Sequence, residues 1–345
     1  MKALILKEYG RFAVEDVPEP ELRPDAVLVA VQACGICGSD VHGMDGSTGR
    51  RQPPIIMGHE AAGVIAKVGG AVEGWQPGER VTFDSTIYCG VCDFCRNGQV
   101  NLCDNRRVLG VSCGDYRQNG AFAEYVALPP RILYRLADSL SFEHAAMAEP
   151  LSIAFHAVRR SGVKKGDRAV VVGAGLIGLL IVQALRLEGC AQIAAVDIAP
   201  AKLALARQFG ATAVIDSAKP GALRDILDLT EGRGSDAVFE AVGIAPTVDL
   251  AMRSARKGGS VTLVGNVAPK VDFPLQICVT REITVYGSCA SSGDYPACLE
   301  ALGGGTVDVA PLISAVAPLE EGPQWFERLY QREAGLFKVM LQPGN

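Results

Sequence analysis

Four cysteines stand close together in the segment CGVCDFCRNGQVNLC, at positions Cys89, Cys92, Cys95 and Cys103. A loop rich in turn-forming residues can fold back so that four thiolates meet at one tetrahedral zinc ion, with no coordination position left for a substrate. We therefore expect a closed, structural zinc site here. The alternative is a group of separate surface thiols, which would be exposed to oxidation.

A second group of candidate metal ligands precedes this segment. VLVAVQACGICGSDVHG passes from an apolar, strand-like run into a glycine-rich turn that contains Cys37, Ser39 and His42, and PPIIMGHEAAG contains His59 next to Glu60. A thiolate, an imidazole and a carboxylate form a mixed ligand set, and such sets leave a position for water or substrate on a catalytic zinc. A single cysteine or histidine is more often an ordinary core residue. Only the combination indicates catalysis.

The third pattern is AVVVGAGLIGLLIVQALRLEGCAQIAAVDIAPAKL, which begins at Ala169. Its valine run predicts a buried parallel strand, and GAGLIG opens a helix whose N-terminus can hold a pyrophosphate. Asp197, 19 residues after the last glycine of GAGLIG, would bind a ribose hydroxyl and repel the extra phosphate of NADP, so we expect NAD in preference to NADP. The alternative is a strand–helix–strand unit that binds nothing. The expected nucleotide site comprises Gly173, Gly175, Leu176, Ile177, Gly178, Asp197, Lys202, Val242, Val264 and Gly265.

The sequence patterns also predict the strands and helices that position these motifs. Beyond Asp197, helix-like and strand-like segments alternate and bring the strand count to six, the number in a full dinucleotide-binding sheet. Short alternating strands with Gly and Pro turns fill the N-terminal part and predict an antiparallel barrel or sandwich. We expect an α/β protein with a β-rich catalytic domain over residues 1–150, a doubly wound NAD-binding domain over 151–290, and a segment, 291–345, that returns to the first domain.

Composition narrows the class of protein. The 345 residues are 49% hydrophobic and 21% charged, which is typical of globular α/β proteins. A net charge of −5, with no Lys or Arg run longer than two, leaves no basic surface for nucleic acid. No apolar window approaches the length of a membrane span, and the N-terminal apolar stretch is too short for a signal peptide. We expect a cytoplasmic protein, where disulfides are rare and clustered thiols favour metal binding.

These segments together carry a family resemblance. In chain order, GICGSDVH, MGHE, the four-cysteine segment, GAFAEYV at 120–126, EPLSIAFHA at 149–157 and GAGLIG resemble the zinc-dependent medium-chain dehydrogenases. The branch they resemble most is that of sorbitol (iditol) and other polyol dehydrogenases, and the resemblance covers nearly the whole chain. It implies a GroES-like catalytic domain followed by a Rossmann domain, one catalytic and one structural zinc ion per chain, and a homo-oligomer, either a dimer or a tetramer.

The resemblance also implies roles for individual residues. It assigns four side chains to the catalytic zinc: Cys37, His59, Glu60 and Glu149. Whether Glu60 or Glu149 binds the metal directly stays open, since family members use these carboxylates either on the metal or in its outer shell. Ser39 and His42 match the proton-relay positions. The four cysteines of CGVCDFCRNGQVNLC match the structural zinc lobe, and Cys34 matches no ligand.

The substrate pocket departs from that of animal-type sorbitol dehydrogenases. Those enzymes have a tyrosine where this chain has Gly43, and an Arg-Tyr pair that aligns near Ala290 and Ser291. Both departures remove groups that would hold a polyol. Three polar residues are candidates to replace them: Asp40, Asp294 and Tyr295. For the last two, a position on a solvent-facing loop is the alternative.

Three functions follow from these observations. We expect a zinc-dependent oxidoreductase that transfers a hydride from a secondary alcohol of a polyol, sugar or sugar acid to NAD. One alternative is an L-threonine 3-dehydrogenase-like enzyme, whose pocket would need fixed charges opposite the amine and carboxylate of threonine. The other is a non-catalytic NAD-binding sensor, which would have no physical need for both metal ligands and a proton relay.

Overall fold

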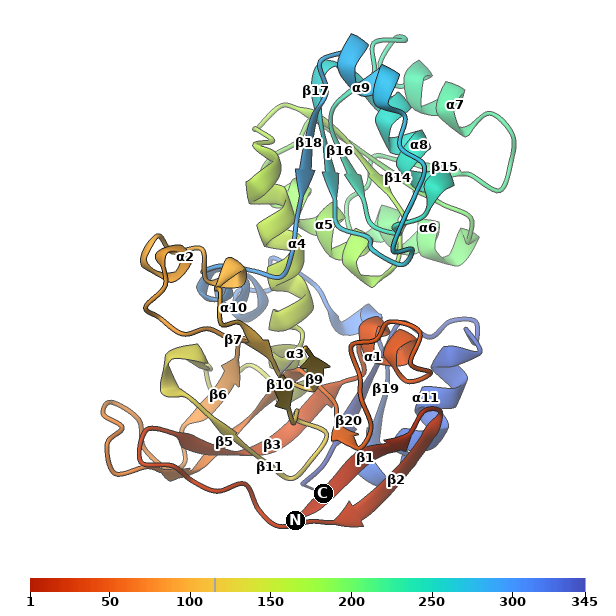
Figure 1. Ribbon diagram of the computed structural model, residues 1–345. Helices are drawn as coiled ribbons and strands as arrows, with labels where there is room; N and C mark the ends of the chain where they lie inside the picture. The colour runs from red at the N-terminus through yellow and green to blue at the C-terminus, as the bar shows by residue number, and fades with distance from the viewer. Residues whose placement is uncertain (115, 345) are drawn as a thin grey trace. The chain divides into compact units, whose positions relative to one another are not determined.

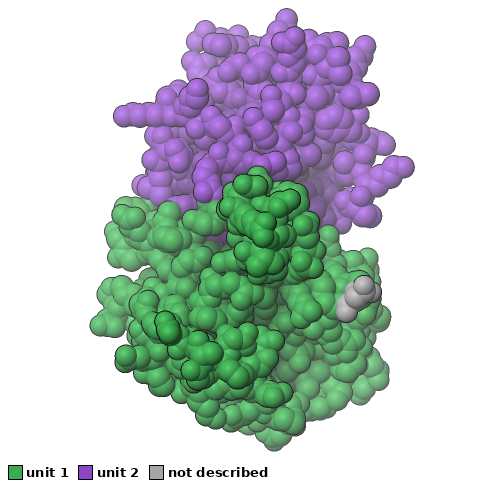
Figure 2. All heavy atoms as spheres, turned by 60° about the vertical axis from the view of Figure 1, so that its left-hand side comes forward, with its two compact units in different colours: residues 1–149, 292–345 green, residues 150–291 purple. Residues whose placement is uncertain are grey.

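The computed structural model describes residues 1–114 and 116–344. The chain divides into two compact units, which Figure 2 colours separately. Unit 1 consists of residues 1–149 and 292–345, and unit 2 of residues 150–291. The chain therefore leaves unit 1 once, forms all of unit 2, and returns to unit 1 for its last segment.

Unit 1 is rich in β-structure (Figure 1). Its strands are β1 (Lys2–Glu8), β2 (Arg11–Asp16), β3 (Val27–Gly35), β4 (Ile55–Ile56), β5 (Glu60–Val68), β6 (Arg80–Phe83), β7 (Thr86–Ile87), β8 (Arg107–Val108), β9 (Val111–Cys113), β10 (Tyr116–Gln118), β11 (Tyr125–Leu128), β12 (Leu133–Arg135), β19 (Ile313–Pro318) and β20 (Lys338–Gln342). Its helices are α1 (Gly38–Gly43), α2 (Asp93–Arg96), α3 (Phe142–Ala146), α10 (Tyr295–Gly303) and α11 (Gly322–Tyr330).

The largest sheet of unit 1 places the candidate ligands. Its strand order is β12-β6-β5-β3-β20-β19, and β11 also pairs with β3. β3 runs antiparallel to both β5 and β20, so that Gly35 lies opposite Glu60 on one side and Met340 on the other. The return of the C-terminal segment thus brings β20 next to the strand that leads into Cys37. Apolar side chains on these strands are buried in one core with α11, whose Phe326 packs edge-on against Phe122.

Unit 2 is a parallel sheet with helices on both faces. Its strands are β13 (Arg168–Val172), β14 (Gln192–Asp197), β15 (Ala213–Asp216), β16 (Ser235–Glu240), β17 (Ala255–Leu263) and β18 (Thr284–Gly287). Its helices are α5 (Leu176–Leu187), α6 (Pro200–Gln208), α7 (Ala222–Asp228), α8 (Ala245–Ser254) and α9 (Leu275–Thr280), and α4 (Ala148–Ser161) leads into it from unit 1.

The strand order in unit 2 is β15-β14-β13-β16-β17-β18, with every neighbouring pair parallel. The chain order reverses between β13 and β16, and ligands of such sheets bind where the carboxyl ends of the strands meet this reversal. β13 is almost completely buried because helices cover both of its faces. The predicted combination of a β-rich part and a six-stranded parallel sheet is confirmed. Among the described residues, no helix has the length and apolar composition that crossing a membrane would require.

Candidate functional site

The structure brings Cys37, His59 and Glu60 together in unit 1. Cys37 follows β3 and caps α1, His59 directly precedes β5, and Glu60 is the first residue of β5. Since β3 and β5 are antiparallel neighbours, the end of one strand meets the start of the other. One ligand atom from each of the three residues lies within 4.8 Å of the others. This arrangement fits a metal ion, because a thiolate, an imidazole and a carboxylate are all zinc ligands.

Cys37 is held by its own helix. Its Sγ accepts hydrogen bonds from the backbone N–H of Ser39 at 3.4 Å and from the Ser39 hydroxyl at 3.3 Å. Burial, together with the negative charge of Glu60, raises the pKa of the Cys37 thiol well above its usual range. A cation among the three ligands would reverse this effect, since metal-bound thiols are deprotonated.

Glu60 is paired with a buried lysine that the sequence did not point to. Lys338, the first residue of β20, donates from Nζ to Glu60 Oε2 and to the carbonyl of Ile36 at 2.9 Å. Both side chains of the pair are 1% exposed. Burial lowers the pKa of Lys338, but the charges of Glu60 and Cys37 outweigh this and raise it overall. A single cation in the apolar strand sequence FKVML was the available signal for this pair.

His59 faces a second buried pair. Its Nδ1 is buried without a hydrogen-bond partner among the described residues and lies 3.6 Å from Asp40 Oδ2. Asp40 in turn forms a salt bridge with Arg51 at 2.8 Å, and both residues are buried. Asp40 is therefore engaged inside the protein, and its suggested role as a contact for substrate hydroxyls does not fit. Arg51 is a further functional candidate that sequence reasoning missed.

Glu149 lies outside the group of three ligands but close enough to act on them. Its Oε1 accepts a hydrogen bond from the Ser85 hydroxyl at 2.9 Å. Burial raises the pKa of Glu149 to about 7; the charge of His59 opposes this rise and that of Glu60 adds to it. The three-ligand cluster and its neighbours therefore contain four acidic groups, which belong to Cys37, Asp40, Glu60 and Glu149. Among the described residues, the buried cations beside them are Arg51, which is paired with Asp40, and Lys338, which is paired with Glu60.

The two expected relay residues occupy the same short helix. Ser39 and His42 both belong to α1 and are exposed, and in the described part of the chain no hydrogen bond joins their side chains. His42 lines a hollow of about 480 Å³ together with Asp45 and Tyr330, whose side chains are hydrogen-bonded to each other at 3.0 Å. A proton that reaches His42 therefore has access to solvent.

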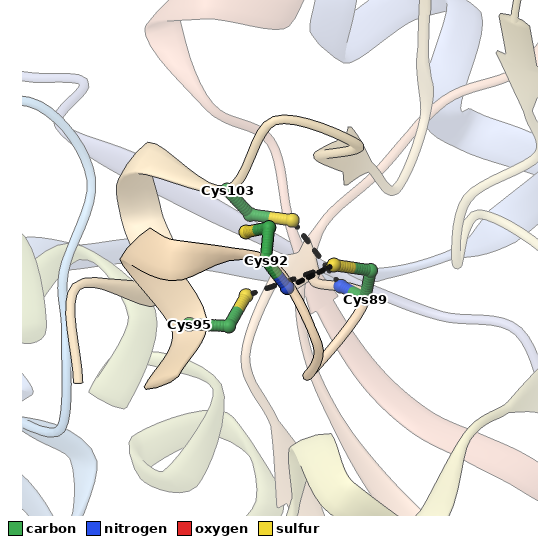
Figure 3. Close-up of side chains that lie close together, drawn as sticks. All are labelled: Cys89, Cys92, Cys95 and Cys103. Carbon is green, nitrogen blue, oxygen red and sulfur yellow. Dashed lines mark hydrogen bonds between the residues drawn. The ribbon is translucent and has the colours of Figure 1, made fainter. Parts of the chain in front are cut away.

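The four cysteines of the lobe converge as their spacing predicts. Figure 3 shows the four sulfurs pointing toward one another, and the ligand atoms lie within 4.8 Å of one another. The segment turns through α2, whose first residue follows Cys92. No disulfide joins any of the eleven cysteines, all of which lie in the described part of the chain. The alternative of separate surface thiols is therefore wrong for this segment.

Backbone donors prepare the lobe for an ion. The N–H groups of Val91 and Cys92 donate to Cys89 Sγ at 3.5 and 3.4 Å and lower the pKa of Cys89 to about 6. Desolvation and the adjacent sulfurs raise the pKa of Cys95 to about 12. Crowded thiols cannot all ionise without a compensating charge, and a divalent cation would supply it.

The glycine-rich loop of unit 2 has the shape that its sequence predicts. Gly173 follows β13 with a positive φ of 99°, and a Cβ at Gly178 would lie 1.8 Å from the Gly173 carbonyl oxygen. Asp197 ends β14 and accepts hydrogen bonds from the amides of Ala174 at 2.7 Å and Ala199 at 2.9 Å. The loop and the carboxylate are thus fixed to each other at the carboxyl edge of the sheet.

The remaining expected nucleotide residues lie on the same unit. Gly175, Leu176 and Ile177 form the start of α5, and Lys202 is partly buried in α6. Val264 and Gly265 follow β17 and donate their amides to the carbonyl of Glu240 at the end of β16. The carboxylate of Glu240, which is fully buried, accepts from Val242 at 3.0 Å. Glu240 was not among the sequence candidates, although Val242, two residues later, was.

The two other candidates for substrate contacts do not face solvent. Asp294 is 5% exposed and accepts a hydrogen bond from the amide of Ser292 at 3.0 Å. Tyr295 begins α10, is completely buried and stacks on Tyr134. The alternative of a solvent-facing loop is therefore wrong for both. Ala290 has a positive φ of 54°, and Ser291 is buried beside it.

Comparisons with known proteins agree with this geometry. Residues 23–138 match the family model "Alcohol dehydrogenase GroES-like domain", and residues 177–303 match "Zinc-binding dehydrogenase". Sorbitol dehydrogenase of Bacillus subtilis is 34% identical over 350 residues, covering 100% of this chain and 98% of the relative. D-xylulose reductase A of Aspergillus oryzae is 36% identical over 337 residues, covering 95% and 93%. A zinc-binding dehydrogenase structure from Sinorhizobium meliloti, bound to NADP, superposes with a TM-score of 0.90 at 34% identity and 99% coverage of both chains.

A mixed Cys-His-Glu cluster in a GroES-like unit and a glycine-rich loop in a Rossmann unit define an oxidoreductase that acts on CH–OH groups. The chain belongs to the zinc-dependent medium-chain dehydrogenases, in the branch that contains sorbitol dehydrogenase and D-xylulose reductase.

Proposed function

We propose that this enzyme oxidises a secondary alcohol of a polyol, sugar or sugar acid, with NAD as the hydride acceptor and two zinc ions per chain. The observation that carries the proposal is the convergence of Cys37, His59 and Glu60 within 4.8 Å. The names of the relatives, sorbitol dehydrogenase and D-xylulose reductase, support the substrate class. The four-cysteine lobe would hold the second zinc, because it offers four thiol ligands and no open position.

The residues of the chain divide the chemistry between them. A zinc ion bound by Cys37, His59 and Glu60 would act as a Lewis acid on the substrate hydroxyl. Ser39, whose hydroxyl lies 3.3 Å from Cys37 Sγ, would accept the proton that leaves the substrate. His42 would receive that proton and release it to the hollow it lines. The glycine loop of unit 2 would hold the dinucleotide, and its nicotinamide would supply the hydride acceptor.

We assign NAD as the cofactor on the basis of Asp197. Its carboxylate is held at the end of β14 by two backbone amides, where it would accept hydrogen bonds from ribose hydroxyls and repel a 2′-phosphate. The following residue, Ile198, offers no positive charge and is 68% exposed. Because the similar S. meliloti structure carries NADP, both cofactors belong in the test.

The buried charges argue against threonine as the substrate. A threonine pocket needs a fixed cation for the carboxylate, and among the described residues the buried arginine and lysine side chains are those of Arg51 and Lys338. Each is paired with a carboxylate and is at most 3% exposed in its side chain. Neither is available as a counter-charge, so a neutral, hydroxyl-rich substrate fits better.

We also propose that the protein is a homo-oligomer joined through the β18 edge of the parallel sheet. β18 is the last strand in the sheet order and leaves one row of backbone groups to pair. Beside it in sequence, α9 exposes Leu275 by 65% and Val279 by 64%. A second copy of the chain would cover both features. Light scattering coupled to size-exclusion chromatography tests this, and a strictly monomeric protein would contradict it.

The proposed activity is tested by following nicotinamide absorbance with zinc-loaded enzyme across polyols, sugars, sugar acids, simple secondary alcohols and L-threonine. We expect turnover on one stereochemical series of polyols or sugars, with kcat/KM for NAD above that for NADP. The variant Asp197→Ala should lose this preference. Turnover on threonine alone would contradict the substrate class, and equal use of NADP by the wild type would contradict the cofactor assignment.

A further inference from the structure

Arg51 is a buried arginine beside the Cys37–His59–Glu60 cluster. Its side chain is 3% exposed, in a segment that also contains the exposed Arg50. Removing a guanidinium from water costs several kcal/mol unless partners compensate it. The partners of Arg51 therefore indicate what the residue does.

The guanidinium divides its donors between two side chains. Nη2 and Nε donate to the same oxygen, Asp40 Oδ1, at 2.8 and 3.3 Å. Nη2 also donates to the Ser39 hydroxyl at 3.3 Å. Nη1 donates to the backbone carbonyl of Arg50 at 3.3 Å, which fixes the plane of the group. Nη2 thus serves Asp40 and Ser39 at once, and the forked guanidinium adds the Nε contact to the same carboxylate oxygen.

Both hydrogen-bond partners of Arg51 also lie next to candidate metal ligands. The second oxygen of Asp40 lies 3.6 Å from His59 Nδ1 and accepts from the Cys37 amide at 3.4 Å. The Ser39 hydroxyl donates to Cys37 Sγ at 3.3 Å. Arg51 thus reaches His59 through Asp40 and Cys37 through Ser39. Within the described part of the chain, no hydrogen bond or ion pair joins Arg51 to either ligand directly.

The backbone makes room for this side chain. A Cβ at Gly43, in α1, would lie 2.6 Å from Arg51 Cγ. Any larger residue at position 43 would push the arginine stem away from Asp40 and Ser39. The presence of glycine at this place is a second feature of the chain that fits the placement of Arg51.

We propose that Arg51 is a positioning residue of the catalytic centre. By fixing the Asp40 carboxylate and the Ser39 hydroxyl, it holds His59 and Cys37 in the arrangement that binds the metal. Without the guanidinium, Asp40 would be a buried charge with no cation beside it, and its carboxylate would turn toward other donors or draw in water. Metal ligands depend on such outer partners for their orientation. The proposal rests on the assignment of a zinc ion to Cys37, His59 and Glu60.

The test compares zinc binding in Arg51→Met, which keeps the apolar stem, in Arg51→Lys, which keeps the charge, and in the control Arg50→Met on the exposed neighbour. Zinc affinity of the folded full-length protein is measured by competition with a chromophoric chelator. We expect Arg51→Met to bind zinc at this centre about 10-fold more weakly, as for other outer-shell partners. Arg51→Lys should fall between Arg51→Met and wild type, and Arg50→Met should equal wild type.

A second measurement separates positioning from general stability. If Arg51 only supported the fold, Arg51→Met would lower the melting temperature of the metal-free chain while the folded fraction kept wild-type zinc affinity, and the proposal would be overturned. The wild-type titration itself tests the zinc assignment, because absence of zinc at this centre in the wild type would remove the premise without involving Arg51.

A double-mutant cycle covers the case in which Arg51→Met does not fold. Arg51→Lys, Asp40→Asn and the double variant are titrated with zinc in the same way. If Arg51 acts through Asp40, the losses in affinity are not additive, because removing either partner breaks the same connection. Additive losses, or wild-type affinity in Arg51→Lys, contradict the proposal.

Discussion

The two cysteine-containing clusters of unit 1 are built in different ways. The four-cysteine lobe takes all its ligands from one segment, residues 89–103, and backbone N–H groups stabilise its sulfurs. The mixed cluster takes Cys37 from the end of β3 and His59 and Glu60 from the start of β5, and its ligands are flanked by Arg51 and Lys338. The lobe can close on an ion by local folding, whereas the mixed cluster exists only when the sheet has formed.

Because of this difference, we expect the lobe to contribute to stability and the mixed cluster to contribute to catalysis. Where a closed site forms from one loop, the free energy of metal binding is also free energy of folding for that loop. The sheet and two buried ion pairs already hold the mixed cluster in place. A metal there would add little to the fold and would be free to serve the proposed reaction. Three predictions follow the comparison, from the largest effect to the smallest.

Replacing a ligand of the mixed cluster should abolish turnover and preserve the fold. In Cys37→Ser we expect kcat to fall by about 10³-fold or more, because the Lewis acid is lost or misplaced. NAD binding and the melting temperature should stay close to wild type, since β3, β5 and β20 remain paired. Steady-state kinetics and NAD titration check this, with Cys113→Ser as a control outside both clusters. Parallel loss of folding in Cys37→Ser would mean that this centre is structural.

Replacing a ligand of the lobe should have the opposite effect. In Cys95→Ser we expect the melting temperature to drop by about 6–12 °C, which corresponds to roughly 3 kcal/mol in a domain of this size. The folded fraction should keep kcat within about threefold, because the lobe offers no open coordination position. Differential scanning calorimetry and activity per folded molecule measure both quantities. Full thermal stability with lost catalysis would require the roles of the two clusters to be exchanged.

The smallest expected effect concerns Asp84, whose charge acts on Glu149 beside the mixed cluster. Burial raises the pKa of Asp84 to about 6, so the folded state holds this proton more tightly than the unfolded state. Ionised Asp84 therefore lowers stability increasingly as pH rises from about 4 to about 6, and by a constant amount above that. Asp84→Asn should be about 2–3 kcal/mol more stable than wild type at pH 8, with the gap narrowing to roughly half of that at pH 5.

Melting temperatures of both proteins between pH 5 and pH 8 test the Asp84 prediction. The difference between variant and wild type isolates this group from others that titrate in the same range. A wild type that is more stable than Asp84→Asn at pH 8 would contradict the prediction. It would mean that hydrogen-bond partners compensate the ionised carboxylate, such as the Thr86 amide, which donates to it at 2.8 Å.

Sequence patterns predicted the parts of the molecule that depend on local rules. The cysteine spacing fixed the lobe because its ligands are neighbours in the chain, and the alternation of valine runs with helices predicted the six-stranded parallel sheet. The glycine loop and Asp197 followed from the same periodicity. The grouping of Cys37 with His59 and Glu60 was predicted from their residue types, but the register of β3 against β5, which brings them together, is not visible in either segment.

Two buried charged residues were the main omission. Arg51 and Lys338 look like surface residues in a linear sequence, since most arginines and lysines are exposed. Their burial depends on carboxylates that come from other segments, Asp40 for one and Glu60 for the other. The position of Glu149 outside the three-ligand group is likewise a matter of tertiary packing against Ser85. None of these pairings has a period or a spacing that could be recognised beforehand.

The central claim is that the chain holds two metal ions in two centres with separate roles. The most direct test of this claim is the zinc content per folded chain, measured by elemental mass spectrometry in the wild type, Cys37→Ser and Cys95→Ser. We predict two zinc ions in the wild type and one in each variant, with activity absent only in Cys37→Ser. One zinc in the wild type, or loss of both ions in Cys37→Ser, would contradict the account.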